Sequence, residues 1–213
     1  MPVDFNLYLI TDRKQPLQGR SLIETVAAAL EGGVRAVQLR EKDLSAAELY
    51  PLARELRELT ARHDARLLIN DRLDVALAVK ADGVHLGGHS LPVVAARKIL
   101  GPDKLIGVST HRFEEVTGAQ RDGADFVTFG PVYFTPSKAV YGEPVGLGPL
   151  REVCSAAPLP VFALGGVTLG CLPELRSSGC RRVALISAIL ASADPAAAAA
   201  AILTHLGNDS QTL

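Results

Sequence analysis

Short apolar runs alternate along the chain with longer segments in which apolar residues recur every three or four positions. The runs are four or five residues long and mostly apolar, which is typical of parallel strands covered by helices. Strands are therefore predicted at 7–11, 36–40, 66–70, 83–86, 105–109, 126–130, 161–165 and 183–187.

The segments between these runs predict helices, and several carry start signals. Ser21 is followed three residues later by Glu24, and Ser45 is followed at the same offset by Glu48. This spacing predicts two capping boxes. The last helix is predicted to begin with Asp194 as its cap. The helical segments are 21–33, 45–64, 73–80, 91–100, 113–122, 148–156, 171–178 and 194–206.

Eight strand–helix units in 213 residues predict a single-domain α/β fold, a (β/α)8 TIM barrel over residues 1–213. The polar tail 207–213 is predicted to fray. A doubly wound open sheet is the alternative, but that fold usually has fewer strands and a glycine-rich first turn. Barrel active sites lie at the C-terminal ends of the strands, so the residues after each run are the functional candidates.

Composition narrows the class of protein. The chain is 48% hydrophobic without a run of eighteen apolar residues, and its start does not resemble a signal peptide. A net charge of −1 disfavours nucleic-acid binding. Three cysteines without CxxC spacing predict reduced packing residues. We expect a cytoplasmic enzyme or binding protein with no membrane or nucleic-acid partner, and the sequence leaves homo-oligomer formation open.

The second strand ends in QLREK, which places Gln38, Arg40 and Lys42 on one side by alternation. Two cations and an amide at the barrel mouth predict an anion site. Arg40 can bind phosphate oxygens in a bidentate manner, and Lys42 supplies a mobile charge. The alternative is a pair of solvated charges that open a loop.

The third strand ends in Asn70 and Asp71, oxygen-bearing side chains of the kind that Mg²⁺ prefers. The alternative is an Asx turn in which Asp71 or Asp74 caps the next helix.

A second anion site is predicted from the other half of the chain. The segment 130–147 is the longest excursion from the barrel and is a candidate lid that carries Thr135, Ser137 and Lys138. After the seventh and eighth strands come a Gly165–Gly166 pair and Ser187, at the usual phosphate position of barrels. Two anion sites predict an enzyme that joins two phosphorylated substrates, or one descended from such an enzyme.

The motifs QLREK, LINDR, ADGVHLG, GVSTH, GPVYFTPSK, ALGGV and ALISAI occur in the order and spacing of the thiamine phosphate synthase family. The resemblance covers about residues 5–205. It implies a (β/α)8 transferase that couples hydroxymethylpyrimidine diphosphate to thiazole phosphate or its carboxylate. Thiamine phosphate and pyrophosphate are the products of that reaction, which is dissociative and uses Mg²⁺.

The resemblance also implies a set of site residues. For catalysis it implies Arg40, Lys42, Ser109 and Lys138. For substrate binding it implies Gln38, Arg40, Lys42, Asn70, Ser109, Thr135, Ser137, Lys138, Gly166, Ile186 and Ser187. For Mg²⁺ it implies Asp71.

One motif departs from the family. Synthases typically read HLGQxDLP where this chain reads HLGGHSLP, so Gly88 replaces a glutamine and Ser90 replaces the second Mg²⁺ carboxylate. A serine hydroxyl is a neutral, weak ligand, so weakly bound Mg²⁺ and slower turnover are expected. The His85–His89 spacing does not predict a zinc site, because glycines interrupt any helix there.

The departure keeps two alternatives open, a thiazole tautomerase and a non-catalytic homologue that binds thiazole or thiamine phosphate. His89 or His111 would be the acid–base group of a tautomerase. Against that reading, Pro131 stands where the tautomerase branch has a histidine, and Asp71 is retained.

Overall fold

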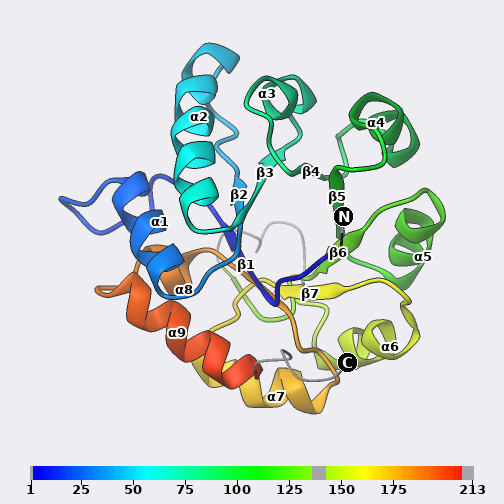
Figure 1. The fold of residues 1–213 in the computed structure, drawn as a ribbon. Coiled ribbons are helices and arrows are strands. Elements are labelled where there is room, and N and C mark those ends of the chain that lie inside the picture. The colour runs from blue at the N-terminus through cyan, green and yellow to red at the C-terminus, as the bar shows by residue number, and fades with distance from the viewer. Residues whose placement is uncertain (1, 136–142, 208–213) are drawn as a thin grey trace.

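The computed structural model describes residues 2–135 and 143–207. Eight parallel strands close into a barrel in which each strand pairs with the next and β8 pairs with β1 (Figure 1). The predicted (β/α)8 fold is confirmed. The strands are β1 (Leu7–Ile10), β2 (Ala36–Leu39), β3 (Arg66–Asn70), β4 (Gly83–Leu86), β5 (Leu105–Thr110), β6 (Phe126–Phe129), β7 (Val161–Leu164) and β8 (Val183–Leu185).

Helices surround the barrel on its outside (Figure 1). They are α1 (Leu22–Glu31), α2 (Ala46–Arg62), α3 (Leu73–Ala78), α4 (Val93–Leu100), α5 (Phe113–Arg121), α6 (Leu147–Ala156), η2 (Leu169–Cys171), α7 (Leu172–Ser177), α8 (Ser187–Leu190) and α9 (Pro195–Leu206). Both capping boxes are present, with Ser21 and Glu24 at the start of α1 and Ser45 and Glu48 at the start of α2. The short helix α8 was not predicted, since residues 183–187 were expected to be strand.

Side chains alternate between the two faces of each strand. Outward residues such as Leu7 and Leu9 pack into the main core between strands and helices. Inward residues form a second cluster, in which Phe5, Phe126 and Phe162 are in ring contact with centroids 5.3–5.7 Å apart. Because Phe5 precedes β1, this aromatic cluster fills the N-terminal part of the barrel. The interior of the barrel is therefore closed to a ligand at that end.

On β2 to β6, inward positions nearer the C-terminal ends of the strands are polar, whereas Ile10 of β1 and Leu164 of β7 are apolar. Asn70 of β3 is level with His85 of β4, and Ser109 of β5 is level with Thr128 of β6. Gln38 lies at the same end of β2. On the β2–β6 side, the barrel interior thus changes from aromatic to polar toward the end where barrel enzymes bind substrates.

Two aspartates tie helices to the N-terminal end of the barrel. The Asp82 carboxylate accepts hydrogen bonds from the Leu67 amide (2.7 Å) and from Arg57 of α2. Asp125 repeats the arrangement, with the Ile106 amide at 2.7 Å and Arg97 of α4 at 2.6 Å. Each carboxylate satisfies a strand N–H that would otherwise lack a partner, so both act in folding.

Three further expectations concern the cysteines, the C-terminal tail and membrane-spanning helices. The three cysteines are free thiols. The tail predicted to fray lies outside the described residues from position 208 onward. In the part of the chain that the structure describes, no helix has both the length and the apolar character needed to span a bilayer.

Candidate active site

Gln38 projects into the barrel and is buried. Its Nε2 donates a hydrogen bond of 3.1 Å to the Tyr8 hydroxyl. Burial raises the pKa of Tyr8 well above its ordinary value, so this hydroxyl stays protonated at neutral pH. Gln38 is therefore held in one orientation at the bottom of the polar end of the barrel.

Arg40 and Lys42 follow β2 and reach progressively further into solvent, Arg40 half-buried and Lys42 exposed. Among the described residues, no carboxylate forms an ion pair with either side chain. Basic side chains without internal partners at a barrel mouth are suited to an anionic ligand. The first predicted anion site thus has its two cations free of competing carboxylates.

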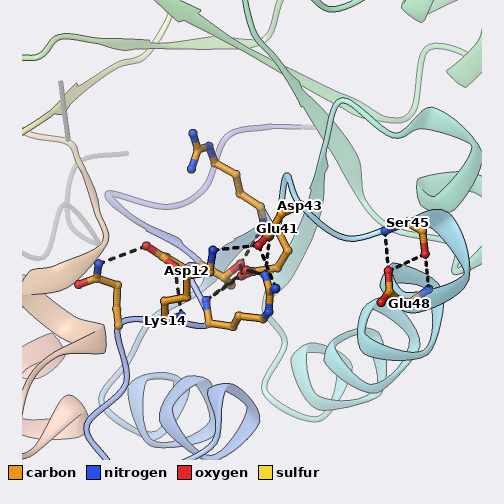
Figure 2. Close-up of polar contacts among 10 residues, drawn as sticks. Asp12, Lys14, Glu41, Asp43, Ser45 and Glu48 are labelled. Carbon is orange, nitrogen blue, oxygen red and sulfur yellow. Dashed lines mark hydrogen bonds and ion pairs between the residues drawn. The ribbon is translucent and has the colours of Figure 1, made fainter. Parts of the chain in front are cut away.

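Glu41, between these two cations, points to the other side and is buried with 2% of its side chain exposed. Its carboxylate contacts residues of the β1–α1 loop, Thr11 and Arg13. Arg13 also pairs with Asp43, which in turn contacts Lys14 (Figure 2). We refer to Thr11, Arg13, Lys14, Glu41 and Asp43 as the Glu41 cluster.

Asp71 follows β3 with a left-handed backbone, at φ +61°. Its Oδ2 accepts a hydrogen bond of 2.9 Å from Asn70. The alternative in which Asp71 or Asp74 caps the next helix is wrong, because α3 begins without a side-chain cap and Asp74 pairs with Arg72. The Asp71 carboxylate is exposed instead, on the same side as Asn70.

Ser90, in the loop after β4, contacts Asp71, in the loop after β3. The Ser90 hydroxyl donates to Asp71 Oδ1 and accepts a hydrogen bond of 2.6 Å from the Gly87 amide. The position that lacks the expected carboxylate is therefore adjacent to the predicted Mg²⁺ ligand. One carboxylate and one hydroxyl supply the hard oxygen donors that suit Mg²⁺, with fewer negative charges than a pair of aspartates.

His85 is buried beneath this group. Its Nε2 lies 3.0 Å from the Ser109 hydroxyl, while Nδ1 has no hydrogen-bond partner among the described residues. Burial lowers the pKa of His85 to about 3; nearby Asp71 acts in the opposite direction and Arg40 in the same one. His85 is therefore a buried, hydrogen-bonded histidine whose ring is neutral at physiological pH.

The second predicted anion site begins where the β6–α6 loop meets the β7–α7 turn. The Tyr133 amide donates a 3.0 Å hydrogen bond to the Gly165 carbonyl. Gly165 and Gly166 have φ of +95° and +66°, and a Cβ on Gly166 would lie 2.6 Å from the Phe134 carbonyl oxygen. This close approach requires glycine and holds the start of the loop, up to Thr135, beside β7.

The β8 loop completes this side. β7 and β8 pair with Leu164 level with Ala184, so Gly166 and Ile186 leave the barrel at equal heights. Ser187 is exposed at the start of α8. Two residues predicted for this site, Ser137 and Lys138, lie outside the described residues.

A sequence model of the family described as thiamine monophosphate synthase matches residues 7–189. The chain belongs to this family. It is 56% identical over 204 residues to the "Putative thiamine-phosphate synthase" of Geobacter sulfurreducens, a match that covers 96% of this chain and 95% of that protein. It is 45% identical over 194 residues to the thiamine-phosphate synthase of Clostridium novyi, covering 91% of this chain and 95% of that one.

A solved structure supports the assignment of the chain to this family. Thiamine phosphate pyrophosphorylase from Pyrococcus furiosus is 36% identical with a TM-score of 0.85, over 94% of this chain and 95% of that one. These members of the thiamine monophosphate synthase family indicate a transferase of the thiamine-phosphate synthase type. They give no support to the tautomerase alternative.

In this thiamine monophosphate synthase fold, motifs in the sequence predict the residues at the barrel mouth but not Thr11 and Glu41 behind them. Glu41 and Thr11 carry no motif that connects them, because they are thirty residues apart. The odd–even alternation in QLREK was the available signal, since it places a carboxylate between two cations on the opposite side of the chain.

Proposed function

We propose that this protein couples hydroxymethylpyrimidine diphosphate to thiazole phosphate or its carboxylate, giving thiamine phosphate and pyrophosphate. The observation that carries the proposal is the β2–β3 register, in which Leu39 is level with Ile69, so Arg40 follows β2 at the height of Asn70. Arg40 and Lys42 have no carboxylate partner in an ion pair among the described residues, and Asp71 follows Asn70 directly. A diphosphate with its metal ion needs both kinds of group, cations for the phosphate oxygens and a carboxylate for the metal.

In this proposal Arg40 and Lys42 bind the diphosphate oxygens. The hydrogen bond from Asn70 to Asp71 fixes the orientation of the Asn70 side-chain amide, so that the amide oxygen of Asn70 faces the substrate. Lys138, outside the described residues, is proposed to reach the phosphates from the β6–α6 loop. The pyrimidine ring would lie against Ser109 and the amide of Gln38, polar groups that close the barrel interior beneath it.

Mg²⁺ is proposed to bind at Asp71, with the diphosphate supplying further oxygens. When bound, it would neutralise charge on the diphosphate and make pyrophosphate a better leaving group. Ser90 provides a hydroxyl where a second carboxylate was expected. We therefore propose that the ion is held less tightly than by two carboxylates.

The proposed reaction needs little acid–base catalysis by side chains of the protein. The C–O bond between the pyrimidine methylene and the diphosphate breaks, and its electron pair leaves on pyrophosphate. The thiazole nitrogen then donates its lone pair to the methylene cation and forms the new C–N bond. Arg40 and Lys42 stabilise the departing charge, and no side chain has to take up a proton. The neutral, buried His85 is compatible with this mechanism.

The thiazole phosphate is proposed to bind on the other side of the mouth. Thr135 and Ser137 would hold its phosphate, with backbone N–H groups at Gly166, Ile186 and Ser187. The positive φ of Gly166 supports this, because it lets the backbone approach a ligand where a side chain would obstruct it. Holding the two substrates face to face places the thiazole nitrogen where it can attack the methylene cation.

The test supplies both substrates with a Mg²⁺ series and follows thiamine phosphate and pyrophosphate by chromatography. Equimolar formation of the two products is expected, and it should be lost without Mg²⁺. No product at any Mg²⁺ concentration would contradict the proposal. If thiazole phosphate then still raised the melting temperature, the protein would be a non-catalytic binder of that ligand.

A further inference from the structure

The Glu41 cluster lies directly behind the cations proposed for the diphosphate. Figure 2 shows Glu41 and Asp43 facing Lys14 and its neighbours on the β1–α1 loop. Glu41 Oε1 accepts hydrogen bonds from Thr11 Oγ1 (2.7 Å) and from the Arg13 amide (3.1 Å). Its Oε2 accepts from the Arg13 amide (3.2 Å) and from the Arg13 guanidinium (3.1 Å). A carboxylate this deeply buried is stable only with such a set of donors.

Thr11 links this carboxylate to the backbone of the neighbouring cation. The Thr11 hydroxyl accepts a 2.9 Å hydrogen bond from the Arg40 amide, and it donates its own hydrogen to Glu41. The Thr11 amide in turn donates to the Gln38 carbonyl at 2.9 Å. These contacts connect two loops that are thirty residues apart in the chain, and they hold the main chain on both sides of Arg40.

The Glu41 cluster also balances its own charge. Its two carboxylates, Glu41 and Asp43, meet two cations, Arg13 and Lys14, so the cluster sums to zero. Arg13 lowers the pKa of Asp43 most, and Lys14 lowers it further, so that this carboxylate is ionised at neutral pH. Glu41 pairs with Arg13, and among the described residues it forms no ion pair with Arg40 or Lys42.

We propose that Glu41 is a positioning residue for the diphosphate site, a role that rests on the proposed function. Through Thr11 it fixes the main chain at Arg40, and through Arg13 it holds the β1–α1 loop against the β2–α2 loop. Arg40 and Lys42 are thereby presented on one side of the chain, where neither forms an ion pair with a carboxylate of the described residues. The Glu41 side chain does not touch the substrate.

The experiment measures steady-state kinetics for each substrate separately in Glu41→Gln. The KM for the pyrimidine diphosphate is expected to rise about tenfold, because the loss of a buried charged partner loosens the loop that carries Arg40. The KM for thiazole phosphate, which is proposed to bind at the far side of the mouth, should stay within about twofold. Mg²⁺–pyrophosphate binding by calorimetry should weaken in parallel with the first KM.

Glu48→Gln is the matched control. It makes the same change in a carboxylate of the same loop region, in the α2 capping box (Figure 2). Both KM values should stay within about twofold of the unchanged protein. If Glu48→Gln and Glu41→Gln raised both KM values alike, the effect would be general loosening, and the proposal would be overturned.

Thr11 gives a second pair of variants in case Glu41→Gln does not fold. Thr11→Val keeps the shape and removes the hydroxyl, so it should reproduce the selective rise in KM. Thr11→Ser restores the hydroxyl and should return the KM to within about threefold. Unchanged diphosphate KM in both Glu41→Gln and Thr11→Val would overturn the inference while leaving the proposed function intact. Absence of activity in the unmodified protein would instead contradict the proposed function.

Discussion

The Ser90 hydroxyl donates a hydrogen bond to Asp71, so the residue at the position where a second carboxylate was expected contacts the proposed Mg²⁺ ligand. Ser90→Asp would place two negative charges side by side, which repel unless a cation lies between them. We expect the Mg²⁺ concentration for half-maximal activity to fall about tenfold. The measurement is product formation over a Mg²⁺ series.

Ser90→Ala serves as the control for this change, since it removes the hydroxyl without adding charge. We expect it to leave the Mg²⁺ requirement unchanged or higher. In melting experiments without metal, Ser90→Asp should be the less stable of the two, and Mg²⁺ should restore it selectively. An identical Mg²⁺ response in both variants would show that position 90 does not face the metal.

Arg40 is the residue on which the diphosphate proposal depends most. Arg40→Ala should lower kcat/KM for the pyrimidine diphosphate by about 100-fold, because a charge-assisted bidentate contact to the leaving group is lost. Arg40→Lys keeps the charge without the planar fork and should give an intermediate loss. Arg121→Ala removes an arginine that is 79% exposed on α5 and should leave kcat/KM unchanged. Equal rates for Arg40→Ala and Arg121→Ala would refute the assignment.

Much of the fold could be predicted because its signals are local. The apolar runs gave all eight strands to within two residues, and Ser45 with Glu48 gave the start of α2. Alternation along β2 also separated Gln38 from Leu39. Candidate site residues can be predicted from their place directly after a strand, because parallel strands in a barrel all end at one mouth.

What could not be predicted depends on contacts between distant segments. Ser90 and Asp71 are nineteen residues apart, and only the turn at Gly87 brings the hydroxyl to the carboxylate. The four-residue helix α8 is too short to show a period of its own, so its first residue, Ser187, was assigned to the preceding strand. The alternative in which Asp74 caps the next helix is wrong because the Asp74 carboxylate pairs with Arg72.

The buried ring of His85 predicts a pH-dependent stability. Its pKa is about 3 in the folded chain and about 6.5 in the unfolded chain, so the unfolded state binds more protons between these values. The contribution of His85 to the free energy of unfolding is therefore fully present above pH 6.5 and is lost as the pH falls toward 3. Between pH 7 and pH 5, His85 alone should account for a loss of about 2 kcal/mol in the free energy of unfolding.

Urea unfolding at both pH values measures this loss. His85→Gln should unfold with a smaller difference between pH 7 and pH 5 than the unmodified protein. His205→Gln changes an exposed histidine of α9 and should retain the full difference. A pH difference that persists unchanged in His85→Gln would mean that other groups are responsible for it.

Gly107 determines how His85 packs inside the barrel. A Cβ at position 107 would lie 2.6 Å from His85 Nδ1 and 2.4 Å from the Phe126 ring. Gly107→Ala should therefore lower the free energy of unfolding by about 1–3 kcal/mol, the usual cost of overpacking a core. It should also displace the imidazole from Ser109, which lies 3.0 Å away, and so raise the KM for the pyrimidine substrate.

Gly118→Ala is the matched control for Gly107→Ala. Gly118 lies within α5, and a Cβ there would meet no atom within 4 Å. Alanine is preferred over glycine inside a helix, so this variant should gain about 0.5–1 kcal/mol. Opposite signs for the two glycines, measured by urea unfolding, would establish that space at position 107 is the limiting factor. A neutral Gly107→Ala would show that His85 and Phe126 can shift to make room, in which case the imidazole position is not fixed by packing.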